Sequence, residues 1–261
     1  MDWTQRFYSR TGRWWGPAES CIGPRDHQRR ATIERLCGPR RQRILDLGSS
    51  YGTTAAVLAH AGHEVVGVEI SERIDFARQY ERQATNGSPR FVRADFYEAA
   101  FDEPFDVVCY WNGFGIGDDA DQRRLLRRIA GVWLKPDGVA LIDVANPTCW
   151  INWAGDEENR TADPTAGYAY NVSERTDFDP VRNRFVDTWW QTETPSEHLS
   201  QSIRCYAPLD FLLLLEGTGL KLDRMELDGE ELDVHRTSTS AHPLWTAHEY
   251  LVKLSRNRVE G

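Results

Sequence analysis

The feature that most constrains this chain is a buried strand that turns through a glycine-bearing loop into a helix. Residues 44–55 read ILDLGSSYGTTA, with apolar residues before Gly48 and helix-forming residues after Gly52. The next apolar run, residues 65–68, ends at Glu69, which places a carboxylate at the carboxyl end of the neighbouring strand. The two glycines let the backbone approach a ligand closely, and an acid at that strand end accepts hydrogen bonds from paired ribose hydroxyls. The pattern therefore predicts a nucleoside site.

The spacing of the two glycines disfavours a dinucleotide. A dinucleotide site uses G-x-G-x-x-G, in which a helix N-terminus receives the pyrophosphate. Here residues 49–51, Ser-Ser-Tyr, separate Gly48 from Gly52. A nucleoside without a pyrophosphate suits this turn better.

Three chemical elements then occur in order on three successive strand ends: Asp46 with the glycine turn, Glu69, and Asp95 with Phe96. With them, the region between residues 43 and 144 resembles the class I S-adenosylmethionine-dependent methyltransferases. The resemblance implies that the turn wraps the methionyl part of S-adenosyl-L-methionine, that Glu69 holds the ribose and that Asp95 with Phe96 contacts the adenine. The cofactor-binding residues expected from it are Asp46, Gly48, Ser49, Ser50, Tyr51, Gly52, Glu69, Ile70, Asp95, Phe96 and Trp111.

Two of these positions have a second interpretation. The family usually has a glycine where this chain has Ser50, a substitution that leaves the predicted turn in place and affects only its local backbone conformation. Asp46 could also be a structural acid that orders the amides of the loop.

Strands and helices alternate along the core, which predicts an α/β fold with a parallel sheet and helices on both faces. The resemblance implies the Rossmann-like class I methyltransferase fold, with a mostly parallel seven-stranded sheet whose final strand is antiparallel. The strands expected from apolar runs cover residues 44–47, 64–69, 90–94, 105–111, 139–144, 220–227 and 245–254. The helices expected cover residues 26–37, 53–61, a segment capped by Ser71, 118–132 and 209–217, with a turn at 135–138.

We expect a single methyltransferase domain over residues 1–261. It divides into an N-terminal aromatic arm and helix (1–42), a cofactor-binding core (43–145), an antiparallel β insertion or cap (146–206) and a C-terminal completion of the sheet (207–261). Within the insertion, residues 168–172 and 184–190 read as strands joined through residues 177–183. We expect the arm to be broken at Gly12, Gly16, Pro17, Gly23 and Pro24.

The loop after the fourth strand is where an open α/β sheet places its ligand crevice. Residues 111–117 read WNGFGIG. In the resembled family this loop runs between the sulfonium and the acceptor, which makes Trp111 and Asn112 candidate catalytic residues. Asn112 would orient the acceptor or the methionyl group, or it simply supports a glycine-rich turn. The loop lacks the Asn/Asp-Pro-Pro-Tyr/Phe pattern of many enzymes that methylate nucleobases or glutamine, which disfavours those acceptors.

Tryptophan is abundant outside the core. Eight of the ten tryptophans lie in the arm, the insertion and the final strand. Large aromatic faces suit an acceptor pocket, and such an arm would fold over the cofactor; the alternative is that these rings only dock arm and cap onto the sheet. The residues expected to line the acceptor pocket are Tyr8, Trp14, Trp15, Phe114 and Trp150.

Composition excludes several other classes of function. The net charge of −9 disfavours a nucleic-acid partner, although residues 1–43 carry a net charge of +6, which is either a solvated face or an attraction for an anionic acceptor. No apolar run is long enough to cross a membrane, so we expect a soluble, cytoplasmic protein. Five scattered cysteines without metal-ligand spacing read as buried free thiols, with no disulfide and no metal. The seven histidines show no paired spacing, and no general base is assigned.

The sequence is therefore interpreted as a methyltransferase that tailors a bacterial metabolite or a small peptide in specialised metabolism, by in-line displacement at a sulfonium. Such a reaction depends on alignment and on exclusion of water. Two alternatives stay open: an enzyme that uses the cofactor for another reaction, such as cyclisation, and a catalytically silent cofactor-binding regulator. The acceptor and the oligomeric state, including a homodimer, are not fixed by the sequence.

Overall fold

The computed structural model describes residues 2–83, 86–236 and 242–257. The chain divides into two compact units. The first contains Met1–Ala100, Gly155–Thr176 and Val186–Gln201, and the second contains Phe101–Ala154, Asp177–Phe185 and Ser202–Gly261. The single domain expected over residues 1–261 stays a prediction, and its last four residues lie outside the described part.

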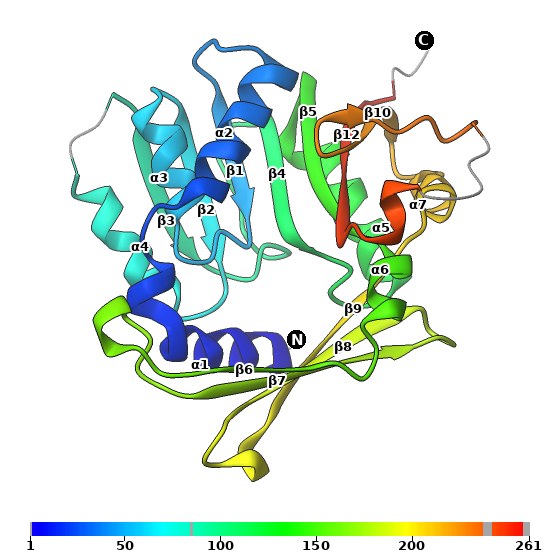
Figure 1. The fold of residues 1–261 in the computed structure, drawn as a ribbon. Coiled ribbons are helices and arrows are strands. Elements are labelled where there is room, and N and C mark those ends of the chain that lie inside the picture. The colour runs from blue at the N-terminus through cyan, green and yellow to red at the C-terminus, as the bar shows by residue number, and fades with distance from the viewer. Residues whose placement is uncertain (1, 84–85, 237–241, 258–261) are drawn as a thin grey trace. The chain divides into compact units, whose positions relative to one another are not determined.

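The first unit contains a three-stranded parallel sheet (Figure 1). Its strands are β1 (Arg43–Leu47), β2 (Glu64–Glu69) and β3 (Ser88–Arg93), with β2 pairing in parallel with both others. Helix α3 (Thr53–His60) connects β1 to β2, and helix α4 (Ile74–Glu81) connects β2 to β3. The apolar runs of β1 and β2 are buried, as is usual for parallel strands covered by helices.

The cap expected at Ser71 is wrong. The residue that caps α4 is Arg73, without a side-chain cap bond, and the Ser71 hydroxyl instead accepts a hydrogen bond from the amide of Arg73 at 3.3 Å. The reason is local, because the amide of Ser71 is bound by the Glu69 carboxylate and the chain makes one further turn before the helix begins.

The N-terminal arm is a continuous helix, α1 (Asp2–Glu19), that runs through Gly12, Gly16 and Pro17, and helix α2 (Pro24–Cys37) follows it. The break expected at Gly23 and Pro24 is confirmed, because it separates α1 from α2. The breaks expected at Gly12, Gly16 and Pro17 are wrong, and the two glycines, four residues apart, lie where α1 meets α4 and its preceding turn. A Cβ atom on Gly12 would lie 2.6 Å from Cγ of Arg73, and one on Gly16 would lie 2.2 Å from Cζ of Phe76. Glycine is therefore present for close packing and not as a helix breaker.

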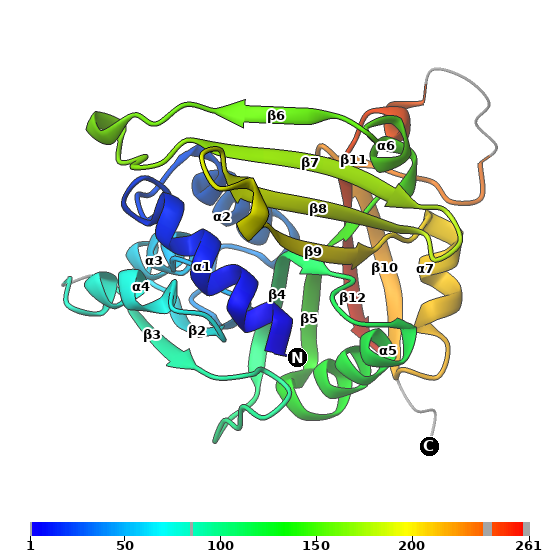
Figure 2. The same ribbon diagram turned by 90° about the horizontal axis from the view of Figure 1, so that it is seen from below.

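The insertion contains a four-stranded sheet (Figure 2). Its strands are β6 (Glu157–Arg160), β7 (Val172–Asp179), β8 (Arg184–Gln191) and β9 (Leu199–Arg204), hydrogen-bonded in that order. The pairing of β6 with β7 is antiparallel. Short 3₁₀ helices, η2 (Pro164–Ala166) and η3 (Pro195–Glu197), precede β7 and β9.

One strand of this sheet starts later than expected. The strand expected over residues 168–172 begins only at Val172 and continues to Asp179, so the connection to β8 is a short turn. The Asp179 carboxylate fixes that turn by accepting hydrogen bonds from the amides of Val181 and Arg182, and Asn183 has a positive φ of 53°. The strand expected over residues 184–190 is confirmed.

The second unit contains a five-stranded mixed sheet. Strands β4 (Phe105–Phe114) and β5 (Leu134–Ala145) pair in parallel, β12 (Glu249–Arg256) is antiparallel to β5, and β10 (Leu220–Leu227) is antiparallel to β12. The antiparallel final strand is thereby confirmed. Strand β11 (Glu230–Glu231) is additional to the seven expected.

The helices of the second unit match the expected order. Helix α5 (Asp119–Arg128) is capped by the Asp118 carboxylate and continues into a π-helix, η1 (Ile129–Trp133). Helix α6 (Pro147–Asn152), helix α7 (Pro208–Leu215) and the 3₁₀ helix η4 (Pro243–Trp245) follow.

Three expectations for the second unit and the cysteines need correction. Residues 135–138 form a bulge inside β5, because Phe105 pairs with Leu134 while Val107 pairs with Val139, which leaves extra residues on β5. The final strand starts at Glu249, since the tryptophan at 245 belongs to η4. Among the cysteines, Cys21 is exposed and not buried. Within the described ranges, no helix combines the length and apolar character that crossing a membrane requires.

Candidate functional site

The turn that follows β1, residues 48–52, is hereafter the glycine turn. Its amide at Ser49 donates to the carbonyl of Val68 at 3.0 Å, which fixes the turn to β2. Gly48, Ser50 and Gly52 have positive φ angles of 61°, 51° and 74°. A Cβ atom on Gly52 would lie 2.6 Å from the side chains of helix α4 and strand β3, so only glycine fits there. Ser50 takes the left-handed conformation that the family glycine adopts freely, so the substitution leaves the turn formed.

Glu69 is held by the backbone on both sides. The amide of Ser50 donates to its Oε2 at 3.0 Å and the amide of Ser71 donates to its Oε1 at 2.8 Å, and the side chain is only 6% exposed. A carboxylate offers about four lone-pair positions, so two remain for further donors. The structure thus brings Glu69 next to the glycine turn as a rigidly oriented acceptor, which suits a pair of ribose hydroxyls.

Asp46 is buried with an unsatisfied oxygen. Its side chain is 2% exposed, and no group in the described residues donates a hydrogen bond to Oδ1. Burial raises the pKa of this carboxyl to about 7, an effect that the nearby Arg29 only partly offsets and that Asp26 and Glu69 increase. A buried acceptor without a partner is costly, so the position fits a ligand that brings a donor or a positive charge. The unpartnered atom is Oδ1 alone, so the cofactor-binding and the loop-ordering interpretations of Asp46 both stay predictions.

Asp95 and Phe96 follow β3. The amide of Ala94 donates to the carbonyl of Glu69 at 3.1 Å, which joins the ends of β2 and β3. The Asp95 carboxylate is half-buried and accepts a hydrogen bond from the amide of Tyr97 at 2.9 Å. Phe96 and Ile70 are also half-buried. The first unit thus places the three predicted elements at the ends of adjacent strands, whereas the contacts with a cofactor stay predictions.

Helix α1 contributes its aromatic residues to a core cluster. Trp14 and Trp15 are 4% and 8% exposed and pack with Phe7 and strands β7 and β9. The ring of Trp15 lies 4.2 Å from that of Trp189, measured between centroids. These tryptophans therefore stabilise the contact of α1 with the antiparallel sheet (Figure 1), and their place in an acceptor pocket stays a prediction. Tyr8 is less buried, and its hydroxyl donates to Oε1 of Gln201 at 2.9 Å.

Two acids beyond Tyr8 were missed by the sequence analysis. Gln201, which accepts from Tyr8, also donates through Nε2 to Oδ2 of Asp187 at 2.9 Å. The hydroxyl of Thr176 donates to Oδ1 of the same aspartate at 3.2 Å. Burial raises the pKa of Asp187 to about 6 and that of Glu174 to about 7. Neither acid forms an ion pair among the described residues.

A signal for these acids does exist in the sequence. Side chains alternate between the two faces of a strand, so Glu174 lies on the face of the buried Val172, and Asp187 lies on the face of the buried Phe185. An acid at an inward position of an otherwise apolar strand face is unusual and indicates a special environment.

In the second unit, the predicted catalytic residues lie near the end of β4. Trp111 is 8% exposed, whereas Asn112 is exposed and has a positive φ of 51°. The pairing of β4 with β5 shifts register between Tyr110 and Phe114, so Asn112 lies in an irregular, bulged stretch. Phe114 is 1% exposed and packs against the rings of α7 and the chain before it. The roles of all three residues stay predictions.

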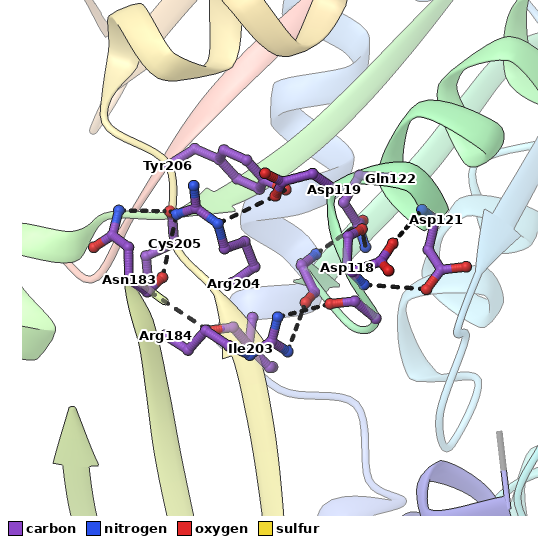
Figure 3. Close-up of polar contacts among 12 residues, drawn as sticks. Asp118, Asp119, Asp121, Gln122, Asn183, Arg184, Ile203, Arg204, Cys205 and Tyr206 are labelled. Atoms are coloured by element: carbon purple, nitrogen blue, oxygen red, sulfur yellow. Dashed lines mark hydrogen bonds and ion pairs between the residues drawn. The ribbon is translucent and has the colours of Figure 1, made fainter. Parts of the chain in front are cut away.

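The loop that follows β4 is fixed to strand β9 (Figure 3). The amide of Arg204 donates to the carbonyl of Gly115 at 2.9 Å, and Ile116 bridges Ile203. A Cβ atom on Gly115 would lie 2.3 Å from the carbonyl oxygen of Arg204, so this pairing requires glycine. Arg184 donates to the carbonyl of Gly117 at 2.7 Å and to that of Ser202 at 2.6 Å.

A second set of contacts holds the start of α5 in the same view (Figure 3). Asp119 accepts hydrogen bonds from Nε of Arg204 at 3.1 Å and from the hydroxyl of Tyr206 at 2.7 Å. Nearby in this unit, the predicted pocket residue Trp150 stacks on Phe185 with centroids 3.9 Å apart and planes 14° apart. No sequence spacing marks Arg184 or Arg204, because their partners are far away along the chain.

Comparison with known proteins gives a consistent result. A family model described as a methyltransferase domain matches residues 44–138. The chain is 32% identical over 120 residues to the cypemycin N-terminal methyltransferase of a Streptomyces species, over 45% of this chain and 48% of that protein. The matched segment thus spans about half the length of this relative.

Solved structures resemble the chain over nearly its whole length. The CcbJ methyltransferase from Streptomyces caelestis has a TM-score of 0.73 at 18% identity and covers 96% of this chain and 98% of its own. The sugar N-methyltransferase KedS8 from Streptoalloteichus sp ATCC 53650 has a TM-score of 0.62 at 19% identity, over 91% and 89% of the two chains. These likenesses confirm the Rossmann-like methyltransferase fold. The family model thus identifies residues 44–138 as a methyltransferase domain, and the three strand-end elements within it agree with the resemblance to the class I S-adenosylmethionine-dependent methyltransferases.

Proposed function

We propose that this chain binds S-adenosylmethionine and methylates an amine of a small metabolite or a small peptide in bacterial specialised metabolism. The observation that carries the proposal is the placement of Glu69, which is fixed by the amides of Ser50 and Ser71 beside the buried, unsatisfied Asp46. One acceptor for ribose hydroxyls and one for a cationic group are what the two ends of this cofactor require.

The residues would divide the work as follows. Glu69 would hold the ribose, Asp46 would face the amino group of the methionyl part, and Asp95 with Phe96 would bound the adenine. When bound, the cofactor supplies an electrophilic methyl group on a sulfonium. The chain's own contribution would be alignment of the acceptor and exclusion of water, which together account for much of the acceleration of a displacement reaction.

Two observations support a nitrogen acceptor. One similar protein is named as an N-terminal methyltransferase of cypemycin, and another is named as a sugar N-methyltransferase. In addition, Asp187 and Glu174 form no ion pair among the described residues, although Arg160 interacts with Glu174 at longer range, and both acids lie in the same unit as the glycine turn. Negative charge there would attract a cationic amine and would disfavour an anionic acceptor.

Calorimetry with S-adenosylhomocysteine tests the cofactor site. Replacing Glu69 with alanine should weaken binding by about 1 to 3 kcal/mol, because two hydroxyls lose a charged acceptor. The isosteric Glu69→Gln variant serves as the matched control for packing and should lose less. Unchanged affinity in a folded Glu69→Ala protein would remove Glu69 from the site, and tighter binding of a nicotinamide dinucleotide would overturn the proposed cofactor.

The acceptor is tested with the methyl-labelled cofactor. Amino sugars and short peptides with free amines are compared with their N-acetylated counterparts, which differ only at the nitrogen. Label should enter the free amines alone. Label in hydroxyl groups of the acetylated compounds would reject a nitrogen acceptor, and cofactor binding without transfer to any compound would favour a silent regulator.

A further inference from the structure

We propose that Arg73 is a positioning residue that couples helix α1 to the glycine turn, so that binding of the cofactor at the turn fixes Tyr8. The inference rests on the proposed function in one respect, namely that the glycine turn is the cofactor site. It adds a residue that the three strand-end elements do not include.

Arg73 contacts both partners through separate nitrogens. Its Nε donates to the carbonyl of Tyr8 at 3.1 Å, and Nη2 donates to the hydroxyl of Thr11 at 3.0 Å. Its Nη1 donates to the hydroxyl of Ser50 at 3.3 Å. The guanidinium carbon lies 5.1 Å from the ring centroids of both Tyr8 and Tyr51. One side chain thus connects the helix with the turn by hydrogen bonds and by cation–π contacts.

The chemistry of arginine suits this position. The guanidinium presents five N–H donors in a planar fork, so it can bind three acceptors in three directions while its faces contact aromatic rings. Lysine has a compact ammonium group and cannot reach both ends at once. Helix α1 also makes room for this side chain, because a Cβ atom on Gly12 would lie 2.6 Å from Cγ of Arg73.

The two ends of the connection lead directly to functional groups. The hydroxyl of Ser50 accepts a hydrogen bond from Arg73, and the amide of Ser50 donates to Oε2 of Glu69, the acceptor assigned to the ribose. At the other end, the Tyr8 hydroxyl donates to Gln201, which binds Asp187. A ligand that orders the glycine turn therefore restrains Tyr8, and by linkage an ordered α1 strengthens ligand binding by the same factor.

Hydrogen exchange tests the coupling without any knowledge of the acceptor. Amide exchange in residues 2–19 is measured in the full chain with and without saturating S-adenosylhomocysteine. In the wild type we expect the ligand to slow exchange in α1 by about fivefold or more, at the low end of typical coupling between sites. In Arg73→Met the ligand-dependent slowing should fall well below that of the wild type while the ligand still binds, leaving what the hydrogen bond from the Tyr51 hydroxyl to the carbonyl of Gly12 carries, and Arg73→Lys should restore only part of the loss.

The control is Arg13→Met. Arg13 also connects α1 to the chain before α4, through an ion pair with Glu72, yet it has no contact with the glycine turn. This variant should keep the full ligand-dependent slowing. Two milder variants, Thr11→Val and Ser50→Ala, cut the connection at either end and should each reduce the slowing, so the test does not depend on Arg73→Met folding.

The outcomes separate this inference from the proposed function. If the wild type fails to bind S-adenosylhomocysteine, the proposed function fails. If the wild type binds the ligand but exchange in α1 does not slow, the coupling is overturned while the proposed function stands. The same holds if the ligand slows exchange in Thr11→Val, Ser50→Ala and Arg73→Met as much as in the wild type. Equal loss in Arg13→Met would show general loosening of α1 and would also overturn it.

Discussion

At the scale of single residues, the role proposed for the buried Asp46 predicts that cofactor binding depends on pH. Burial raises the pKa of its carboxyl to about 7, and a positively charged amino group beside it would favour the ionised form and lower that pKa. Binding should therefore release a proton, and affinity for S-adenosylhomocysteine should rise as the pH is raised from about 6 to about 8. Calorimetry in buffers of different ionisation enthalpy measures the released proton.

The Asp46→Asn variant is the matched control, since its affinity should not change over this pH window. The pH dependence of the stability of the ligand-free protein is a second, independent test of the raised pKa of Asp46. The pKa of Asp46 in the folded state lies above that in the unfolded state, so the folded state binds more protons and stability falls as the pH rises from about 4 to about 7. Asp46→Asn should thus raise the melting temperature more at pH 8 than at pH 5. The opposite order would contradict the buried, unsatisfied state of Asp46.

Ser50 occupies a conformation that costs serine about 1 kcal/mol and glycine nothing. We expect Ser50→Gly to retain cofactor binding, with a dissociation constant that changes less than about tenfold, a limit of about 1.4 kcal/mol. Ser50→Ala loses the same hydroxyl but keeps the strained backbone, so it should be the less stable of the two. Chemical denaturation compares the variants. Complete loss of binding in a folded Ser50→Gly protein would instead make the hydroxyl an essential cofactor contact.

At the scale of elements, the packing of α1 on α4 depends on a missing side chain. A Cβ atom at Gly16 would lie 2.2 Å from the ring of Phe76, so Gly16→Ala should destabilise the protein by about 1 to 3 kcal/mol through overpacking. Alanine is the better helix former by about 1 kcal/mol, so a packing-free site should respond in the opposite direction. Gly131 in η1 is such a site, with nothing within 4 Å of an added Cβ.

Thermal unfolding of the two variants checks this difference. Gly131→Ala is the control and should leave the melting temperature unchanged or raise it. If Gly16→Ala were also neutral, α1 would not be packed as closely on α4 as the structure shows.

Elements defined by an apolar pattern could be predicted from the sequence, and those defined by tertiary packing could not. Strands β2 and β10 begin and end at the predicted residues because their apolar runs are bounded by polar turns. The breaks predicted within helix α1 were wrong, since glycine is a weak helix former by itself. Only the close contacts of Gly12 and Gly16 with Arg73 and Phe76 explain why glycine is present there. The bulge in β5 was taken for a turn for a similar reason, because its residues favour turns locally but are paired with β4 on both sides.

At the scale of the whole molecule, the cofactor site and its surroundings differ in how they are encoded. Asp46, Glu69 and Asp95 lie near the carboxyl ends of three successive strands, so their order along the chain was enough to predict that they lie at adjacent strand ends. Arg73 and Asp187 gained their roles from partners far away in the sequence, such as Tyr8 and Gln201. No spacing rule connects such residues, because the fold alone brings them together.

The loop after β4 is completed late in the synthesis of the chain. Its neighbour Asp119 binds Arg204, which follows 85 residues later, and Tyr206 follows after that. Ribosomes add about 5 to 20 residues per second, so residues 113–119 emerge on the order of 4 to 17 seconds before the strand that holds them. During that interval the apolar Ile116 has no strand β9 to pair with. We therefore expect the growing chain to form the glycine turn first and to fix the loop assigned to the acceptor side only after strand β9 has emerged.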